Sequence, residues 1–294
     1  MQRLTFINSR GQEVIFTNTD PYIFWRISGI ELPAVQANFT QATGQHGYSL
    51  TGLLLESRIV TLTGHVHGKN HKNGTNETAL MYAQRRRLNA VCSPALGPGT
   101  LIYENSHGKW TAQAFCKDET YTNKLKNIQT LSISFECPLP FWLDSEQSQV
   151  MLAYVGGGLQ FPLVTPAEFG MLGYRALADN SSDGPVPIEM YVTGGSENPK
   201  ITNVTTGEFI HIERRVEEWE QIYINTDPEH MEVTLMSKHP VTGEDTRELA
   251  YGYLSNTSNL FSLVPGVNEL TFDSDDENKT IRIRIYYHKR FAGV

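Results

Sequence analysis

Hydrophobic and polar residues alternate through Leu131–Cys137, and this pattern predicts a β-strand with one buried face. In the run LSISFEC every second residue is apolar, and successive side chains of a strand point to opposite faces of a sheet. Pro138 and Pro140 then end the pattern, because proline lacks a backbone N–H. Polar and glycine-rich residues follow. We therefore predict a first domain of residues 1–149 and a second domain of residues 150–294.

Other alternating runs fill the first half of the chain. Residues 4–8 and 13–17 predict a hairpin around a short turn that contains Gly11. Residues 57–64 predict a further strand. Residues 37–52 are rich in Gly, Gln and Thr, a composition typical of a long flexible loop. Loops of this kind often form contact surfaces.

One segment of the first half has the spacing of an α-helix. Met81, Leu88 and Val91 fall on one face of a helix that we place over residues 76–90. The consecutive arginines at 85–87 spread around such a helix, because successive residues are about 100° apart. A phosphate site would need these side chains to converge. The spread favours a solvated face or salt bridges to a neighbouring subunit.

The second half has almost no helical signal and many short β runs. Clusters of Gly, Pro, Asp and Asn separate these runs, which predicts an antiparallel sandwich of the jelly-roll kind. The predicted fold class is therefore mainly β. The first domain is β-rich, sandwich-like or barrel-like with one helix, and the second is a jelly-roll β-sandwich.

Charge is distributed unevenly between the two halves. The net charge is -8, with 13 Lys/Arg against 11 Asp/Glu in residues 1–149 and 11 against 21 in residues 150–294. An acidic second half repels nucleic acid and anionic membranes. Three cysteines make no disulfide framework, so we expect synthesis in a reducing cytoplasm. No apolar run long enough for a membrane span occurs in the sequence.

Sequence motifs of the common enzyme classes are missing. His65 and His67 share a strand face and His71 follows in a turn, but no carboxylate or cysteine close in sequence completes a metal shell. The glutamates within residues 217–220 could form a glycosidase pair, but neighbours in sequence rarely converge across a glycosidic bond. We therefore predict no enzyme, no cofactor and no metal site.

Glycan binding is a second candidate chemistry, because jelly rolls are frequent lectin scaffolds. Trp219, Tyr223, Tyr251 and Tyr253 are the candidates to stack on a pyranose ring. Alternating aromatic residues are also typical of a core or an interface, and both interpretations stay open here.

A series of short motifs runs in a fixed order through nearly the whole chain. They are RIVTLTG at 58–64, RLN at 87–89 before Pro94, SFECP at 134–138, PFW at 140–142, GPVPIE at 184–189, NPKI at 198–201, QIYINT at 221–226, FSLVPGVN at 261–268 and RFAGV at 290–294. This order resembles the distal tail protein family of siphophages, or prophages, of Gram-positive bacteria. The charged insertion at 214–218 and the pair Glu220-Gln221, where the family has Gly-Glu, depart from the pattern.

The resemblance implies a structural protein of the virion, synthesised in the bacterial host cytoplasm and located at the distal tip of the tail. Such proteins form a homo-hexameric ring through the first domain, while a galectin-like second domain projects outward. Implied partners are the major tail tube protein, the tape measure protein, the tail-associated lysin or tip protein, and receptor-binding proteins. DNA would meet the ring only in transit through a neutral or acidic lumen, and no membrane partner is implied.

In a closed ring each subunit presents two different complementary surfaces. Our candidates for these surfaces are Gln41, Gln45, His46, Tyr48, His67, His71, Arg85 and Arg86. Two other hypotheses remain beside the ring. One is a glycan-binding module without a ring role, and the other is a cell-wall hydrolase that uses the glutamates at 217–220.

Overall fold

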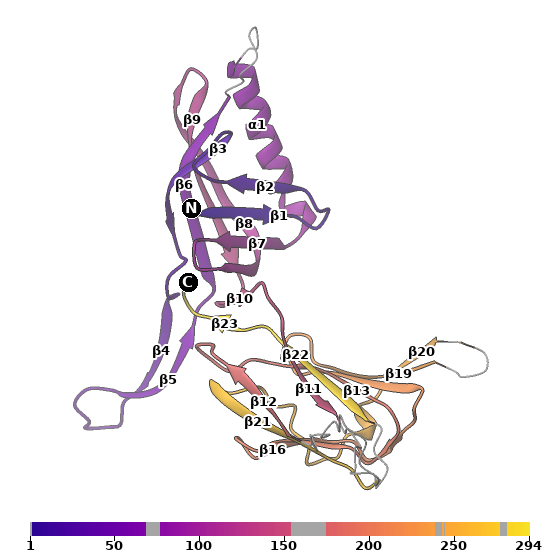
Figure 1. Cartoon of the computed structure of the whole chain (residues 1–294). Coiled ribbons are helices and arrows are strands. Elements are labelled where there is room, and N and C mark those ends of the chain that lie inside the picture. The colour runs from indigo at the N-terminus through magenta and orange to yellow at the C-terminus, as the bar shows by residue number, and fades with distance from the viewer. Residues whose placement is uncertain (1, 69–76, 154–174, 239–242, 244, 277–280) are drawn as a thin grey trace, which may run out of the picture. The chain divides into compact units, whose positions relative to one another are not determined.

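The computed structural model describes residues 2–68, 77–153, 175–238, 243, 245–276 and 281–294. These residues form mainly β-strands, which confirms the predicted fold class (Figure 1). They divide into two compact units, Met1–Ser145 with Phe291–Val294 and Glu146–Arg290. The domain boundary at 149/150 itself stays a prediction. Within the described ranges, no α-helix combines the length and the apolar character that a membrane crossing requires.

The first unit is built on an antiparallel sheet with strand order β2-β1-β7-β8-β9-β6-β3. Its strands are β1 (Arg3–Ile7), β2 (Glu13–Phe16), β3 (Tyr22–Ser28), β6 (Arg58–His67), β7 (Gly99–Glu104), β8 (Lys109–Leu125) and β9 (Ile128–Cys137), with the short β10 (Trp142–Asp144) and β23 (Arg290–Phe291) beside them. β1 and β2 form the predicted hairpin, with Ile7 opposite Glu13. β6 and β9 pair along their full lengths.

The core of the first unit follows the alternation seen in the sequence. Alternate residues of β9 are buried, and Phe135 packs against Phe6 and Phe16 with ring centroids 5.0 Å and 6.3 Å apart. Trp142, in the segment that follows the two prolines, is fully buried. Each fully buried large apolar side chain contributes roughly 1.5–3 kcal/mol.

Helix α1 (Glu77–Val91) covers this core. Met81, Leu88 and Val91 are its buried residues, which confirms the predicted helix and its apolar face. The first position predicted for the helix, residue 76, lies outside the described residues. The helix is followed by the short 3-10 helix η1 (Pro94–Leu96), so the chain turns at the expected proline.

The loop predicted over residues 37–52 is wrong at both ends, because residues 37–40 and 49–52 belong to the two strands of a β-hairpin. β4 (Val35–Thr40) pairs with β5 (Ser49–Leu55) in antiparallel register, with one irregularity after Asn38. Gly44 and Gly47 have positive φ angles of 82° and 78° and occupy the connecting turn, so the glycine signal marked the turn rather than the whole segment. Within the described residues this pair joins no larger sheet. We call it the β4–β5 arm, and Figure 1 shows it standing away from the sheet of its own unit.

The second unit is an antiparallel β-sandwich. Its large sheet has the order β11-β22-β13-β18-β19-β20 and its small sheet the order β12-β21-β15-β16. The strands are β11 (Ser148–Ala153), β12 (Arg175–Asn180), β13 (Glu189–Thr193), β15 (Lys200–Asn203), β16 (Glu208–His211), β18 (Glu220–Asn225), β19 (Glu232–Lys238), β20 (Asp245–Leu249), β21 (Gly266–Asp273) and β22 (Arg282–Tyr287). β14 (Ser196–Glu197) and β17 (Arg215–Val216) form a small ribbon, and the 3-10 helix η2 (Tyr251–Tyr253) follows β20.

One core lies between the two sheets of this sandwich. Ile222 and Ile224 of the large sheet and Ile201 and Leu270 of the small sheet belong to the same buried cluster, as expected when two sheets pack face to face. Its likeness to galectins stays a prediction.

A buried arginine, Arg58, joins separate loop segments of the first unit through hydrogen bonds. Arg58 is 1% exposed, and its guanidinium donates to Pro140 O at 2.8 and 3.0 Å, to Gly29 O and Glu31 O at 2.6 Å, and to Ala292 O. Four backbone carbonyls from three separate segments therefore share one side chain. A buried charge is tolerated only with such a complete set of partners.

The last four residues of the sequence belong to the first unit rather than the second. Phe291 and Val294 pack against its core, and Val294 N donates to Ile30 O at 3.1 Å. The chain thus leaves the first unit after Ser145 and returns to it at Phe291.

Candidate functional site

The β4–β5 arm carries an exposed apolar face. Phe39 lies opposite Leu50, and Ala37, two residues from Phe39, lies opposite Leu53, so these side chains share one face. Phe39, Leu50 and Leu53 are 54–60% exposed. A two-stranded ribbon is at best marginally stable alone in water, and exposed apolar patches usually mark contacts with another protein. The arm is therefore a candidate interaction surface.

Four of the predicted interface residues lie in the turn at the tip of this arm. Gln41 Nε2 donates to Gln45 O at 3.1 Å, and Gln45 Nε2 donates to Ser49 Oγ at 2.9 Å, so the glutamines order the turn. His46 is exposed. Tyr48 is 70% exposed. The structure therefore places these four residues beside the apolar face of the arm.

The predicted pair His65 and His67 lies on one face of β6, but the two rings contact different partners. His67 Nδ1 pairs with the Asp20 carboxylate, and His67 Nε2 lies 3.3 Å from Asn127 Nδ2. His65 instead packs on the ring of Trp25, with centroids 4.3 Å apart. His71 lies outside the described residues. Within the described segments, no group of three or more His, Cys, Asp or Glu side chains is arranged to hold a metal ion.

The two candidate arginines of α1 differ in their surroundings. Arg85 Nη1 donates to Gln129 Oε1 at 2.9 Å, and its guanidinium lies 4.0 Å from the centroid of the Tyr121 ring. Arg85 therefore fastens the helix to the sheet. Arg86 is exposed. Their role at a subunit interface stays a prediction.

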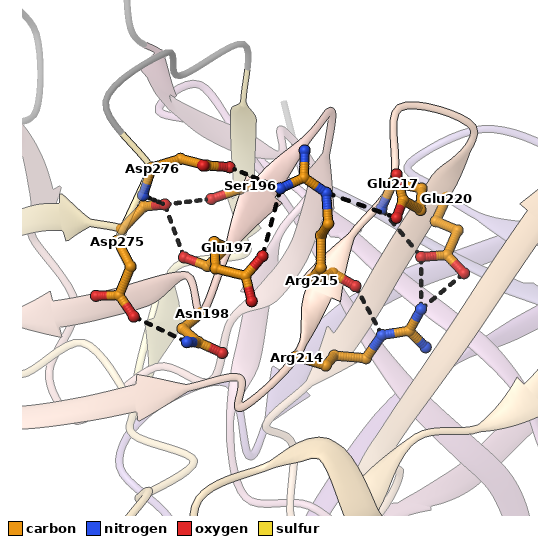
Figure 2. Close-up of polar contacts among 10 residues, drawn as sticks. Ser196, Glu197, Asn198, Arg214, Arg215, Glu217, Glu220, Asp275 and Asp276 are labelled. Carbon is orange, nitrogen blue, oxygen red and sulfur yellow. Dashed lines mark hydrogen bonds and ion pairs between the residues drawn. The ribbon is translucent and has the colours of Figure 1, made fainter.

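The charged insertion of the second unit folds into a network of ion pairs (Figure 2). Arg214 Nη2 contacts both carboxylate oxygens of Glu220, at 2.7 and 2.8 Å, and the Arg214 guanidinium lies 4.6 Å from the centroid of the Tyr253 ring. Glu220 Oε2 also accepts from the backbone N–H of Glu217 at 3.0 Å. These groups close the turn between β17 and β18.

Arg215 lies on the other side of the same insertion. It contacts Glu197 at 3.3 Å, Asp276 at 3.2 Å and Glu217 at 3.5 Å. The hydrogen bond to Glu197, together with the charge of Asp276, raises the pKa of Arg215 above its ordinary value. Glu217 and Glu220 are thus engaged in ion pairs (Figure 2), an arrangement that pins the β14–β17 ribbon.

The outward face of the large sheet gathers three tyrosines, and we call it the tyrosine face. Tyr191 of β13 lies opposite Tyr223 of β18 and opposite Arg284 of β22, and Glu189 lies opposite Tyr286. The Tyr191 ring is 5.0 Å from that of Tyr223 at 45°, and 5.8 Å from that of Tyr286 at 85°. Burial, with a smaller contribution from Glu189, raises the pKa of Tyr191, so its hydroxyl is protonated at neutral pH.

A hollow of about 370 Å³ opens on the tyrosine face. It is lined by Gln147, Glu189, Tyr191, Gln221, Arg284 and Tyr286. A second hollow of about 350 Å³ shares Gln221 with it and is bordered by Trp219. Both volumes lie in the lower part of the range that takes small ligands.

The four aromatic residues predicted for glycan binding are divided by the structure. Tyr223 lies on the tyrosine face and Trp219 borders the neighbouring hollow. Tyr251 and Tyr253 lie in η2, where Tyr251 Oη donates to Met231 O at 2.8 Å and Tyr253 Oη donates to Glu248 Oε1 at 3.1 Å. Whether any of the four contacts a glycan stays a prediction.

Two tyrosines of this face were missed by sequence reasoning. The runs EMYVT at 189–193 and RIRIYY at 282–287 alternate, which is enough to place Glu189 with Tyr191 and Arg284 with Tyr286. The pairing of β13 with β22 joins segments about ninety residues apart, and alternation alone does not reveal it.

Two family models match the chain, one on each unit. The phage tail protein RIFT-related domain matches residues 9–137, and the siphovirus-type tail component, C-terminal domain, matches residues 181–291. A search among curated proteins found no match.

Solved structures share the fold over nearly the full chain. The crystal structure of the SPP1 Dit (gp 19.1) protein, described as a paradigm of the hub adsorption apparatus in Gram-positive infecting phages, has a TM-score of 0.68 at 11% identity, covering 98% of this chain and 99% of that one. A chain of the phage P2 baseplate, in its activated conformation with Ca, has a TM-score of 0.53 at 11% identity, covering 100% and 99%. The same baseplate with Sr gives 0.52 at 12% identity and the same coverage.

Proposed function

Because this chain belongs to the siphophage distal tail protein family, we propose that it is a structural subunit of the hub at the distal end of the tail tube. In this proposal six copies form a ring through the first unit. The ring connects the major tail tube protein and the tape measure protein to the tail-associated lysin or tip protein, and it anchors receptor-binding proteins. The second unit faces outward, and DNA passes through the ring during infection.

The observation that best supports a ring is the β4–β5 arm. Phe39, Leu50 and Leu53 lie on one face of the arm and are each more than half exposed. In a cyclic assembly the arm of each subunit would lie on the next subunit, so every copy would give one arm and receive one. Burying the exposed parts of such side chains would contribute roughly 1 kcal/mol or more each. In a closed ring every subunit interface would gain this free energy, so the arms together would stabilise the assembly considerably.

Charge is compatible with the passage of DNA. Residues 1–149 carry 13 basic against 11 acidic side chains, and Arg85, one of those basic side chains, is engaged with Gln129. A nearly neutral ring lumen would not retain a polyanion.

The test is the solution mass of the purified full chain, measured by light scattering. We expect a mass near six subunits for the parent chain. The double change Leu50→Asp with Leu53→Asp should yield monomers with an unchanged circular dichroism spectrum, because it places charges on the exposed face of the arm. The matched control is Leu177→Asp, an equally exposed leucine (63%) on β12 of the second unit, which should stay hexameric.

Two outcomes would count against this proposal. A hexamer that persists in the double variant would show that the arm does not carry the interface. A parent chain that stays monomeric at its highest soluble concentration would exclude a ring that closes by itself.

A further inference from the structure

The hollow on the tyrosine face is made by neighbouring strands in the middle of the large sheet. β13 lies between β22 and β18, and both pairings are antiparallel and in regular register. Adjacent strands are about 4.8 Å apart and alternate residues of a strand about 6.8 Å apart. The outward side chains of the three adjacent strands β22, β13 and β18 therefore form a compact surface. This surface is about as large as one or two sugar rings.

Four polar side chains of the hollow lack a hydrogen bond or ion pair to any residue that the structure describes. Among the residues that the structure describes, Gln147, Glu189, Gln221 and Arg284 line the hollow and make no side-chain hydrogen bond or ion pair. In the charged insertion, by contrast, Arg214 and its neighbours are joined to one another. Glu189, Gln221 and Arg284 are half-buried and Gln147 is exposed, so all four are available to a ligand that supplies partners.

The rings beside these groups are held in fixed orientations. Tyr191 lies between Tyr223 and Tyr286, nearly perpendicular to the second. Such edge-to-face packing is favourable, so the orientation of the tyrosine rings is fixed before a ligand binds. An oriented aromatic ring offers a flat apolar surface to the C–H face of a sugar, while its hydroxyl reaches a polar group.

The charges of the hollow select the class of ligand. Glu189 and Arg284 offset each other in the lining, so neither an anion nor a cation is favoured overall. Residues 150–294 carry 11 basic against 21 acidic side chains, which disfavours phosphate and nucleic acid further. β13 is paired on both sides and offers no free edge to an extended peptide.

We propose that this hollow binds a neutral saccharide through Tyr191, Arg284 and Glu189. The Tyr191 ring stacks on the sugar, the Arg284 guanidinium donates to ring hydroxyls, and the Glu189 carboxylate, with the two glutamine amides, accepts from them. All lining residues belong to the second unit. The proposal therefore goes beyond the hub function and does not depend on a ring.

The test is saturation-transfer NMR of the full chain with galactose, glucose, mannose, rhamnose, N-acetylglucosamine and N-acetylgalactosamine. We expect at least one sugar to bind. Tyr191→Ala and Arg284→Met should each weaken that binding about tenfold or more, because each removes a main contact. The control Arg175→Met removes an exposed arginine of the small sheet, paired with Glu269, and should bind like the parent chain.

Three results would overturn the proposal. The first is binding of none of the six sugars. The second is binding that survives both changes, or that is lost with Trp219→Ala alone, because the sugar would then lie outside this hollow. The third is displacement of the bound sugar by inorganic phosphate, which would reveal an anion site. The circular dichroism spectrum of each variant shows that it is folded.

Discussion

Arg58 shows how much one side chain can organise. It donates to carbonyls of Gly29, Glu31, Pro140 and Ala292, and removal of the side chain leaves these buried and part-buried acceptors without their partner. Each acceptor that is shielded from water and loses its partner costs about 1 kcal/mol or more. We predict that Arg58→Ala lowers the free energy of unfolding of the first unit by about 3 kcal/mol or more, measured by urea denaturation.

Arg10→Ala is the matched control for Arg58→Ala. Arg10 is an exposed arginine in the turn between β1 and β2, and its removal should leave the unfolding midpoint unchanged. A small effect at Arg58, equal to that at Arg10, would mean that water readily replaces the guanidinium. From the sequence, Arg58 is only one residue of the strand predicted over residues 57–64, and nothing in its neighbours indicates a buried cation.

At the scale of elements, the ribbon of β14 and β17 allows a comparison of two adjacent arginines. The side chains of Arg214 and Glu220 are 23% and 11% exposed, whereas that of Arg215 is 49% exposed. Shielded ion pairs stabilise more than exposed ones. We predict that Arg214→Ala lowers the free energy of unfolding of the second unit by about 2 kcal/mol.

Arg215→Ala should change the stability of the second unit far less than Arg214→Ala, although Arg215 has more ion-pair partners. Thermal denaturation of both variants at low and at high salt would measure this difference. An equal loss for the two variants would contradict the view that shielding, rather than the number of partners, decides the contribution.

The elements were predictable where a pattern was local. The hairpin of β1 and β2, the helix with Met81 and Leu88 on its buried face, and the strand over Leu131–Cys137 all follow from spacing along the chain. The β4–β5 arm was missed although Val35, Ala37 and Phe39 alternate with polar residues, because the Gly, Gln and Thr content of residues 37–52 was given more weight than this alternation. The tyrosine face was missed for another reason, since strand order is not a local property.

At the scale of the whole molecule, the two ends of the described chain lie in one unit. Phe291 and Val294 pack on the core of the first unit, and Ala292 accepts from Arg58. We predict that deletion of residues 291–294 destabilises the first unit and leaves the second unchanged. Hydrogen exchange read by mass spectrometry should rise around residues 29–31 and 138–142, and not in β13 or β18.

The same exchange pattern in Arg58→Ala would show that the deletion acts through loss of the hydrogen bond between Arg58 and the Ala292 carbonyl. Faster exchange confined to the second unit would contradict the assignment of the last residues to the first. The matched control is Arg175→Met, which changes only the small sheet.

The return of the chain has a consequence for how such proteins diversify. Residues 146–290 are inserted between two segments of the first unit, so they form a cassette with an entry joint and an exit joint. Recombination that respects both joints can exchange the cassette while the residues around Arg58 stay intact. A crossover at one joint alone would combine foreign residues 291–294 with the original Arg58, which donates to the Ala292 carbonyl. An exchange at both joints would therefore replace the whole inserted unit and leave both segments of the first unit unchanged.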